Sequence, residues 1–309
     1  MDPKDQSWTV ADIPSQKGKN ILVTGANAGL GLASAHILAG KGANVIMACR
    51  YMPKAEEARE SILAEFPDAS LDIVHLDLAD LSSVSAAAAK INEKYSQLHV
   101  LMNNAGMNTF RRRETTDGFE LTLATNHLGH FALTAQLFDL LKSTAASRVV
   151  TLSSSGHRSG KIDFDDLMSQ NAYRMMKAYG QSKLANLLFA KQLQRNIERD
   201  NLDMLSVAVH PGLVATNMVN RYSDRSFLLQ IPARLFSLFL LAPAEGARPQ
   251  LYVATADGIE GGKYYVEGNN GHPVQERPTR DARNQTIGER LWMVSEELTA
   301  QSFPNATKA

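Results

Sequence analysis

The chain has 309 residues, enough to bury a substantial core, and its composition is ordinary for a soluble globular protein. Its 32 lysines and arginines balance its 32 aspartates and glutamates, so no charge excess indicates a nucleic acid or an anionic membrane as a partner. The single cysteine, Cys49, excludes an intramolecular disulfide framework and fits a reducing compartment, so we expect a cytoplasmic protein.

The first 17 residues are polar and lack the apolar run of a signal peptide, so we expect an N-terminal surface arm over 1–17 and one domain over 18–309. The most apolar stretch, 227–241, is too short to span a bilayer and contains Pro232 and Arg234. We therefore expect no transmembrane anchor. This stretch could instead be a lid, a subunit contact or a membrane-associating segment.

The first third of the chain alternates short apolar runs with helical patterns. Strands are predicted over 20–24, 45–49, 71–76 and 100–103, and helices over 32–39, 54–65 and 81–95. Parallel neighbouring strands need crossover connections, which helices usually supply. The alternation therefore favours the α/β class, with a single doubly wound, Rossmann-type parallel sheet and helices on both faces.

Two long helical patterns follow, over 118–141 and 172–198, with a fifth strand predicted between them over 148–153. A sixth strand over 205–209 ends at the sequence His210-Pro211-Gly212. The stretch 213–241 is less regular and more apolar, as expected of a region that covers a substrate. A helix over 244–254, a short strand over 263–266 and a terminal helix over 284–298 complete the chain.

A glycine turn joins the first predicted strand to the first predicted helix, with the spacing Gly-x-x-x-Gly-x-Gly. Glycines leave room for the backbone to approach a pyrophosphate, and the following helix offers free amides and the positive end of its dipole. The position between a strand and a helix is the context that this interpretation requires. We predict a dinucleotide site that includes Gly25, Asn27, Gly29, Leu30 and Gly31.

Tyr179 and Lys183 lie four residues apart in the second long helical pattern, so both side chains lie on one helix face. A neighbouring ammonium favours the charged form of a phenol, so Lys183 could lower the pKa of Tyr179 from its ordinary value of about 10. Alone, the pair is explained as well by a ring packing on an aliphatic stem.

Together, the glycine turn, the sequence Asn103-Asn104-Ala105-Gly106, Asn126, Ser154 and the Tyr179–Lys183 pair closely resemble the short-chain dehydrogenase/reductase family. The resemblance covers nearly the whole chain, and its five parts occur in the family's order. Within the family, the stretches 48–50, 126–131, 179–186, 210–212 and 282–292 look like the branch of the retinol dehydrogenases and WW-domain oxidoreductases.

The resemblance implies an NADP-dependent oxidoreductase that transfers a hydride between nicotinamide and an apolar alcohol or carbonyl substrate. It makes Tyr179 the acid/base at the substrate oxygen, and Lys183 the residue that holds the nicotinamide ribose and lowers the tyrosine pKa. Ser154 would hydrogen-bond the substrate oxygen, and Asn126 would position a water of the proton relay. Ser153, Ser154 and Ser155 are adjacent, however, and each could serve only the turn backbone; Asn126 could bond only within its helix.

Further cofactor contacts are expected at the ends of the other strands. Arg50 suits a 2′-phosphate and no acid accompanies it, which favours NADP over NAD, although a solvent-facing arginine is the alternative. The resemblance also places Asp77 and Leu78 at the adenine. It places Asn104, Ala105 and Gly106 under the adenosine ribose, and adds Pro211, Gly212 and Thr216 to the cofactor contacts. Thr216 could instead cap a helix.

Four histidines, His127, His130, His157 and His210, lack carboxylate or cysteine support at ligand spacing, so we expect structural roles and no metal. The two long helices are where many family members dimerise, which implies a homodimer or homotetramer. Two other functions stay open: a nucleotide-sensing scaffold without turnover, and another chemistry on the same fold, such as nucleotide-sugar modification.

Overall fold

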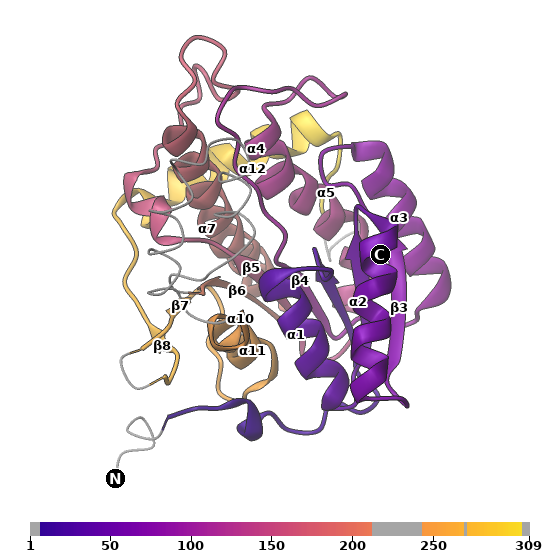
Figure 1. The fold of residues 1–309 in the computed structure, drawn as a ribbon. Helices are drawn as coiled ribbons and strands as arrows, with labels where there is room; N and C mark the ends of the chain where they lie inside the picture. Colours follow the sequence, from indigo (N-terminus) through magenta and orange to yellow (C-terminus); the bar gives the residue numbers. More distant parts are fainter. Residues whose placement is uncertain (1–6, 212–242, 269–270, 305–309) are drawn as a thin grey trace, which may run out of the picture.

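The computed structural model describes residues 7–211, 243–268 and 271–304. They form one eight-stranded sheet in the order β3-β2-β1-β4-β5-β6-β7-β8, with helices on both faces (Figure 1). All neighbouring strands are parallel except the last pair, β7 and β8. The predicted α/β fold with a doubly wound, Rossmann-type sheet is confirmed.

The strands are β1 (Asn20–Thr24), β2 (Asn44–Cys49), β3 (Ser70–His75), β4 (Val100–Asn103), β5 (Ser147–Leu152), β6 (Met204–His210), β7 (Tyr264–Val266) and β8 (Val274–Gln275). The α-helices are α1 (Gly29–Gly40), α2 (Met52–Glu65), α3 (Leu81–Lys94), α4 (Leu121–Leu123), α5 (Gly129–Gln136), α6 (Phe138–Lys142), α7 (Met175–Arg199), α10 (Pro243–Gly246), α11 (Arg248–Thr255) and α12 (Gln285–Thr299). The short helices are η2 (Val10–Asp12), η3 (Ala124–Leu128), η4 (Ser155–Ser159) and η5 (Asp281–Arg283).

The sheet is buried on both faces because its strands are apolar almost throughout. Along β1, Ile21 and Val23 pack into a core with residues of α1, α2 and α11. Leu22, between them, packs into the opposite core with residues of α3, α5 and α7. Successive side chains of a strand point to opposite faces, so a parallel sheet covered twice needs apolar residues at nearly every position.

The helix predicted over 118–141 begins later and is not uniform. Gly118 adopts a φ of +81°, and the Glu120 carboxylate accepts hydrogen bonds of 2.8 Å from the amides of Thr122 and Leu123, which starts the helix at Leu121. The chain then passes from α4 through the π-helical turn η3 into α5. Such turns are rare and often lie at functional sites.

The C-terminal part differs from the prediction in two places. The helix predicted over 244–254 is divided into α10 and α11, and Pro249 lies in the first turn of α11, where a missing amide proton does no harm. The antiparallel strand β8, only two residues long, was not predicted, because so short a segment carries no alternation.

The described part of the N-terminal arm packs against the sheet and its helices. The Trp8 ring contacts Tyr252 of α11 edge to face, with 5.3 Å between the ring centroids, and Ile13 is buried. The Lys41 ammonium, at the end of α1, donates to the carbonyl oxygens of Ala11 and Ile13 at 3.0 and 2.9 Å. Within the described ranges, every helix is too short or too polar to cross a bilayer.

Candidate active site

The predicted site residues gather at the carboxyl ends of the parallel strands. Gly25 follows β1, Asn104 follows β4, and Ser154 lies just beyond β5. The strand order reverses between β1 and β4, since the chain runs outward to β3 on one side of β1 and to β5 on the other. Ligands of open α/β sheets bind outside the strand ends at such a point.

The glycine turn is built so that backbone is exposed at the start of α1. Gly25 and Gly29 adopt φ values of +68° and +54°, which disfavour other residues. A Cβ on Gly31 would lie 2.3 Å from the Gly25 carbonyl oxygen, so only glycine fits there. Ala28, the residue before α1, offers no side-chain acceptor, which leaves the first helix amides without a cap of that kind in the described structure. This cradle can receive a phosphate group.

The segment after β4, Asn104 and Ala105, is hydrogen-bonded to Thr24, directly before the glycine turn. The Asn104 side-chain amide donates to the Thr24 carbonyl at 2.7 Å, and the amides of Asn104 and Ala105 donate to Thr24 Oγ1 at 3.0 and 2.9 Å. The Ala105 methyl lies 3.1 Å from where a Cβ of Gly25 would be. The structure thus gives Asn104 and Ala105 a direct part in shaping the predicted phosphate cradle.

Arg50, Asp77 and Leu78 lie together at the neighbouring strand ends. Arg50 Nη1 lies 4.0 Å from Asp77 Oδ2, and half of the Arg50 side chain is exposed, at 51%. The guanidinium is therefore open to a phosphate or to solvent alike. Leu78 is buried, and its carbonyl oxygen would lie 2.2 Å from a Cβ on Gly129, so the loop after β3 packs directly on the start of α5.

The Tyr179 and Lys183 side chains share one face of α7, as the spacing predicted, with Lys183 Nζ 5.8 Å from the Tyr179 ring centroid. Lys183 is 3% exposed and its ammonium donates to the Leu152 carbonyl at 3.2 Å. Burial lowers the pKa of Lys183 to about 8. Burial also raises the pKa of Tyr179, partly opposed by a hydrogen bond with the Ser154 side chain. Burial thus moves the Tyr179 pKa in the direction opposite to the one that a neighbouring ammonium would give.

Ser154 lies beside Tyr179 and also begins the short helix η4. Its hydroxyl oxygen accepts from the Gly156 amide at 3.1 Å, and the hydroxyl also hydrogen-bonds the Tyr179 side chain. A Cβ on Gly156 would lie 3.0 Å from Tyr179 Cε1, so glycine lets the phenol ring approach this turn. Ser153 instead donates to the Lys183 carbonyl at 2.8 Å. Of these two serines, Ser154 faces the tyrosine.

Asn126 lies in the π-helical turn η3, and its side chain reaches outside its own helix. Its Oδ1 accepts from the Met107 amide at 2.7 Å, and its Nδ2 donates to the Met107 carbonyl and to Ser182 Oγ, both at 2.9 Å. A Cβ on Gly106 would lie 3.4 Å from both Asn126 Oδ1 and Lys183 Nζ. Gly106, Asn126 and Lys183 therefore meet at one point.

Not all of the predicted cofactor contacts lie within the described residues. Pro211 is buried at the end of β6, whereas Gly212, Thr216 and the region 213–241 lie outside the described residues. Two further residues contact the site: Thr24 was not predicted, and His130 was expected to have only a structural role. Thr24 directly precedes Gly25, and His130 follows Asn126 by one helical turn, which are the positional signals that could have identified them.

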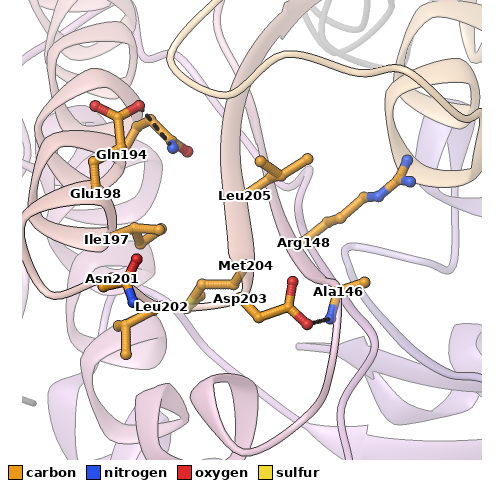
Figure 2. A pocket seen from close by; sticks show the side chains of 10 residues that line it. All are labelled: Ala146, Arg148, Gln194, Ile197, Glu198, Asn201, Leu202, Asp203, Met204 and Leu205. Atoms are coloured by element: carbon orange, nitrogen blue, oxygen red, sulfur yellow. Dashed lines mark hydrogen bonds between the residues drawn. The ribbon is translucent and has the colours of Figure 1, made fainter.

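A second concave region lies at the opposite ends of the strands. This groove, of about 460 Å³, is lined by Arg148 at the start of β5 and by Met204 and Leu205 at the start of β6 (Figure 2). The Arg148 guanidinium donates to the carbonyls of Val253 and Ala256 at 2.9 and 2.7 Å, and the Asp203 carboxylate accepts from the Ala146 amide at 3.0 Å. These bonds hold loops in place, and the groove contains none of the predicted residues.

Residues 19–226 match the family model described as short chain dehydrogenase. Retinol dehydrogenase 12 of Bos taurus is 43% identical over 283 residues, which cover 91% of this chain and 86% of that protein. Retinol dehydrogenase 13 of Homo sapiens is 39% identical over 294 residues, covering 93% of this chain and 86% of that protein.

Solved structures of other proteins align with most of the chain. An uncharacterised protein from Mycobacterium paratuberculosis aligns with a TM-score of 0.79 and 36% identity, over 97% of this chain and 100% of that chain. A protein from Beutenbergia cavernae, assigned as an NAD(P)-dependent gluconate 5-dehydrogenase and solved with bound NADP at low occupancy, aligns with a TM-score of 0.63 and 25% identity, over 82% of this chain and 96% of that chain.

Proposed function

The chain belongs to the short-chain dehydrogenase family and is an NAD(P)-dependent oxidoreductase, and from this we propose that it transfers a hydride between NADP and an apolar alcohol or carbonyl substrate. One observation carries the proposal. Ser154, Tyr179, Lys183 and Asn126, from three separate parts of the chain, meet at the strand ends beside the glycine cradle.

The residues of the cradle fit a dinucleotide. Gly31 cannot carry a Cβ, and the first amides of α1 lie where a pyrophosphate would meet the positive end of the helix dipole. Lys183, which lies beside Gly106, would hold the nicotinamide ribose. The bound nicotinamide supplies the hydride for reduction or accepts it for oxidation.

The protein's own part is to move a proton and to stabilise charge. During carbonyl reduction negative charge develops on the substrate oxygen, and the Tyr179 hydroxyl donates its proton to that oxygen. The Ser154 hydroxyl, which hydrogen-bonds Tyr179 in this structure, would donate to the same substrate oxygen. Oxidation runs the same steps in reverse. The buried Lys183 ammonium, 5.8 Å from the Tyr179 ring centroid, would lower the free-energy cost of the tyrosinate.

NADP is proposed over NAD because Arg50 directly follows β2, its side chain is half exposed, and Asp77 Oδ2 lies 4.0 Å from its Nη1. An arginine can hold a 2′-phosphate through paired, charge-assisted hydrogen bonds. The Beutenbergia cavernae relative, solved with NADP, is consistent with this choice.

An apolar substrate is proposed from the resemblance to enzymes named for retinol and from Met107, which Asn126 holds beside the site. A cytoplasmic location, one domain over 18–309 and a homodimer or homotetramer stay proposals too. The α12 helix lies against α7 and α5 (Figure 1), so a dimer through those two helices would have to include α12 in the contact.

The test is a panel of apolar alcohols and carbonyls with NADP(H) and NAD(H), in which absorbance of the reduced nicotinamide is followed. We expect Tyr179→Phe to lose at least about 100-fold in kcat, the usual worth of a positioned acid/base. Tyr173→Phe is the matched control, because Tyr173 precedes α7 and its hydroxyl donates to the Thr109 main-chain oxygen at 2.6 Å. Full turnover by Tyr179→Phe would refute the mechanism. Cofactor binding without turnover on the whole panel would favour the sensor.

A further inference from the structure

A buried histidine connects the glycine turn with the catalytic centre. His130, on α5, is 1% exposed. Its Nδ1 lies 3.0 Å from the Asn126 main-chain oxygen, and its Nε2 lies 2.9 Å from Thr24 Oγ1. Thr24 is the last residue of β1, directly before Gly25. One imidazole ring therefore touches both the strand that carries the predicted phosphate cradle and the turn that carries Asn126.

The proton positions in this contact follow from its partners. A carbonyl oxygen only accepts hydrogen bonds, so the proton is on Nδ1. Burial lowers the pKa of His130 to about 4, so the ring is neutral and Nε2 is an acceptor. Thr24 Oγ1 already accepts from the amides of Asn104 and Ala105, and its own proton goes to Nε2 at 2.9 Å rather than to the Met102 carbonyl at 3.3 Å. Each group therefore donates to the next: the Asn104 and Ala105 amides to Thr24 Oγ1, Thr24 Oγ1 to His130 Nε2, and His130 Nδ1 to the Asn126 main-chain oxygen.

The π-helical turn η3, which carries Asn126, is held by hydrogen bonds from other segments of the chain. In η3 the Gly129 amide donates to the Ala124 carbonyl five residues earlier, which is the π-helical pattern and an uncommon one. Asn126 lies within it, and its side chain is held by Met107 and Ser182. The His130 bond fixes the main chain of the same residue. Together they determine where Asn126 lies relative to Lys183.

We propose that His130 is a positioning residue of the oxidoreductase, whose neutral ring holds the Asn126 main chain at a fixed place relative to the glycine turn. The inference rests on the proposed function, since Asn126 matters only if the site transfers protons. His130 acts through Asn126 and Thr24. Loss of its bond to Asn126 should lower kcat, whereas the affinity for the cofactor should change little, because Thr24 keeps the bonds that support the cradle.

Two amide substitutions separate the two ends of the ring. In His130→Asn the side-chain amide takes the place of Nδ1 and keeps a donor for the Asn126 carbonyl. In His130→Gln the amide reaches the place of Nε2, which keeps the contact with Thr24 and loses the bond to Asn126. Both variants leave one partner unpaired in a buried place, so a merely structural histidine predicts similar losses of Tm and of kcat in the two.

The experiment compares kcat, KM, the NADPH dissociation constant from fluorescence titration, and Tm for the wild type and both variants. We expect His130→Asn to stay within about fivefold of the wild-type kcat. We expect His130→Gln to lose about 10- to 100-fold, as a misplaced group costs, with an NADPH dissociation constant within about threefold of wild type. His99→Gln is the control: His99 Nδ1 accepts from the Asn20 amide at 3.0 Å at the other end of β1, so this variant should lose Tm and keep kcat.

Equal kcat in the Asn and Gln variants, or a larger loss in Asn than in Gln, would overturn the inference. If His130→Gln does not fold, a ¹⁵N NMR spectrum of the wild type tests the inference. It should show a neutral His130 ring with the proton on Nδ1. A proton on Nε2 would refute the inference. A wild type that binds NADPH but turns over no substrate would refute the proposed function instead, and the NMR result would still test the hydrogen-bond path.

Discussion

A single hydroxyl can serve the fold and the chemistry at once, and we propose that Ser154 does so here. Its oxygen accepts the Gly156 amide and so starts η4, the role that a bland interpretation of three adjacent serines suggested. The same bond engages one lone pair of the oxygen, and the hydroxyl also hydrogen-bonds Tyr179. The structural and the catalytic interpretations of Ser154 are therefore compatible.

Arg50 is the residue on which the choice of cofactor depends. Replacing it with aspartate removes a donor for a 2′-phosphate and supplies an acceptor for a ribose hydroxyl. We expect Arg50→Asp to raise KM for NADP by about 10- to 100-fold, the worth of a charge-assisted hydrogen bond, and to leave or improve KM for NAD. Steady-state kinetics with both cofactors measure this. An equal loss with both cofactors would contradict the assignment of Arg50 to the 2′-phosphate.

At the scale of the elements, the glycine turn joins β1 to α1 with almost no spare volume. A Cβ on Gly31 would meet the Gly25 carbonyl oxygen at 2.3 Å and Asn104 Nδ2 at 2.6 Å, and neither can move without breaking the turn. We therefore expect Gly31→Ala to lose NADPH binding by at least about 100-fold, and to lower Tm. Titration by fluorescence and thermal unfolding measure the two effects.

Gly288→Ala is the matched control for this prediction. Gly288 lies within α12, and the nearest atom to a Cβ there, Arg195 Nη1, is 3.5 Å away, an ordinary contact. Alanine in a helix is favoured over glycine by about 1 kcal/mol, so this variant should be as stable as the wild type or more so, with unchanged cofactor binding. If both alanines weaken NADPH binding alike, the close approach at Gly31 is not the cause.

Sequence patterns predicted the elements that repeat a simple period, and missed those that depend on contacts between distant segments. The apolar run at 20–24 and the glycines after it identified β1 and the cradle, because a strand buried on both faces has its own signature. The π-helical turn at Asn126 has no such signature, since its residues fit an α-helix equally well. The link from Thr24 to His130 joins residues 106 positions apart, and nothing local indicates it.

At the scale of the whole molecule, α12 packs against α5 and α7, the helices next to the candidate site. The Trp292 ring stacks on Phe189 of α7, with 5.8 Å between the centroids, and meets Phe131 of α5 edge to face at 5.1 Å. Ser295 of the same helix lies 2.9 Å from His127 Nε2, directly beside Asn126. The helix α12 thus packs on α5, on α7 and on the π-helical turn that carries Asn126.

Burial of several histidines makes the stability of the whole molecule depend on pH. Burial lowers the pKa from the ordinary 6.5 to about 3 for His127, and to about 4 for both His130 and His210. Between these values the unfolded chain binds more protons than the native one. The full stability is therefore present above pH 6.5, and it falls as the pH decreases towards about 4, by up to about 1.4 kcal/mol per pH unit for each histidine.

We accordingly expect Tm to fall by several degrees between about pH 7 and pH 5, well above the range in which the carboxylates titrate. Circular dichroism melts at constant ionic strength measure this. In His127→Gln the amide can still reach Ser295 but does not titrate, so the decrease should be shallower than in the wild type. A Tm that stays constant down to pH 5 would mean that these rings accept protons in the folded protein without cost, and that the ordered hydrogen bonds at His127 and His130 do not depend on neutral imidazoles.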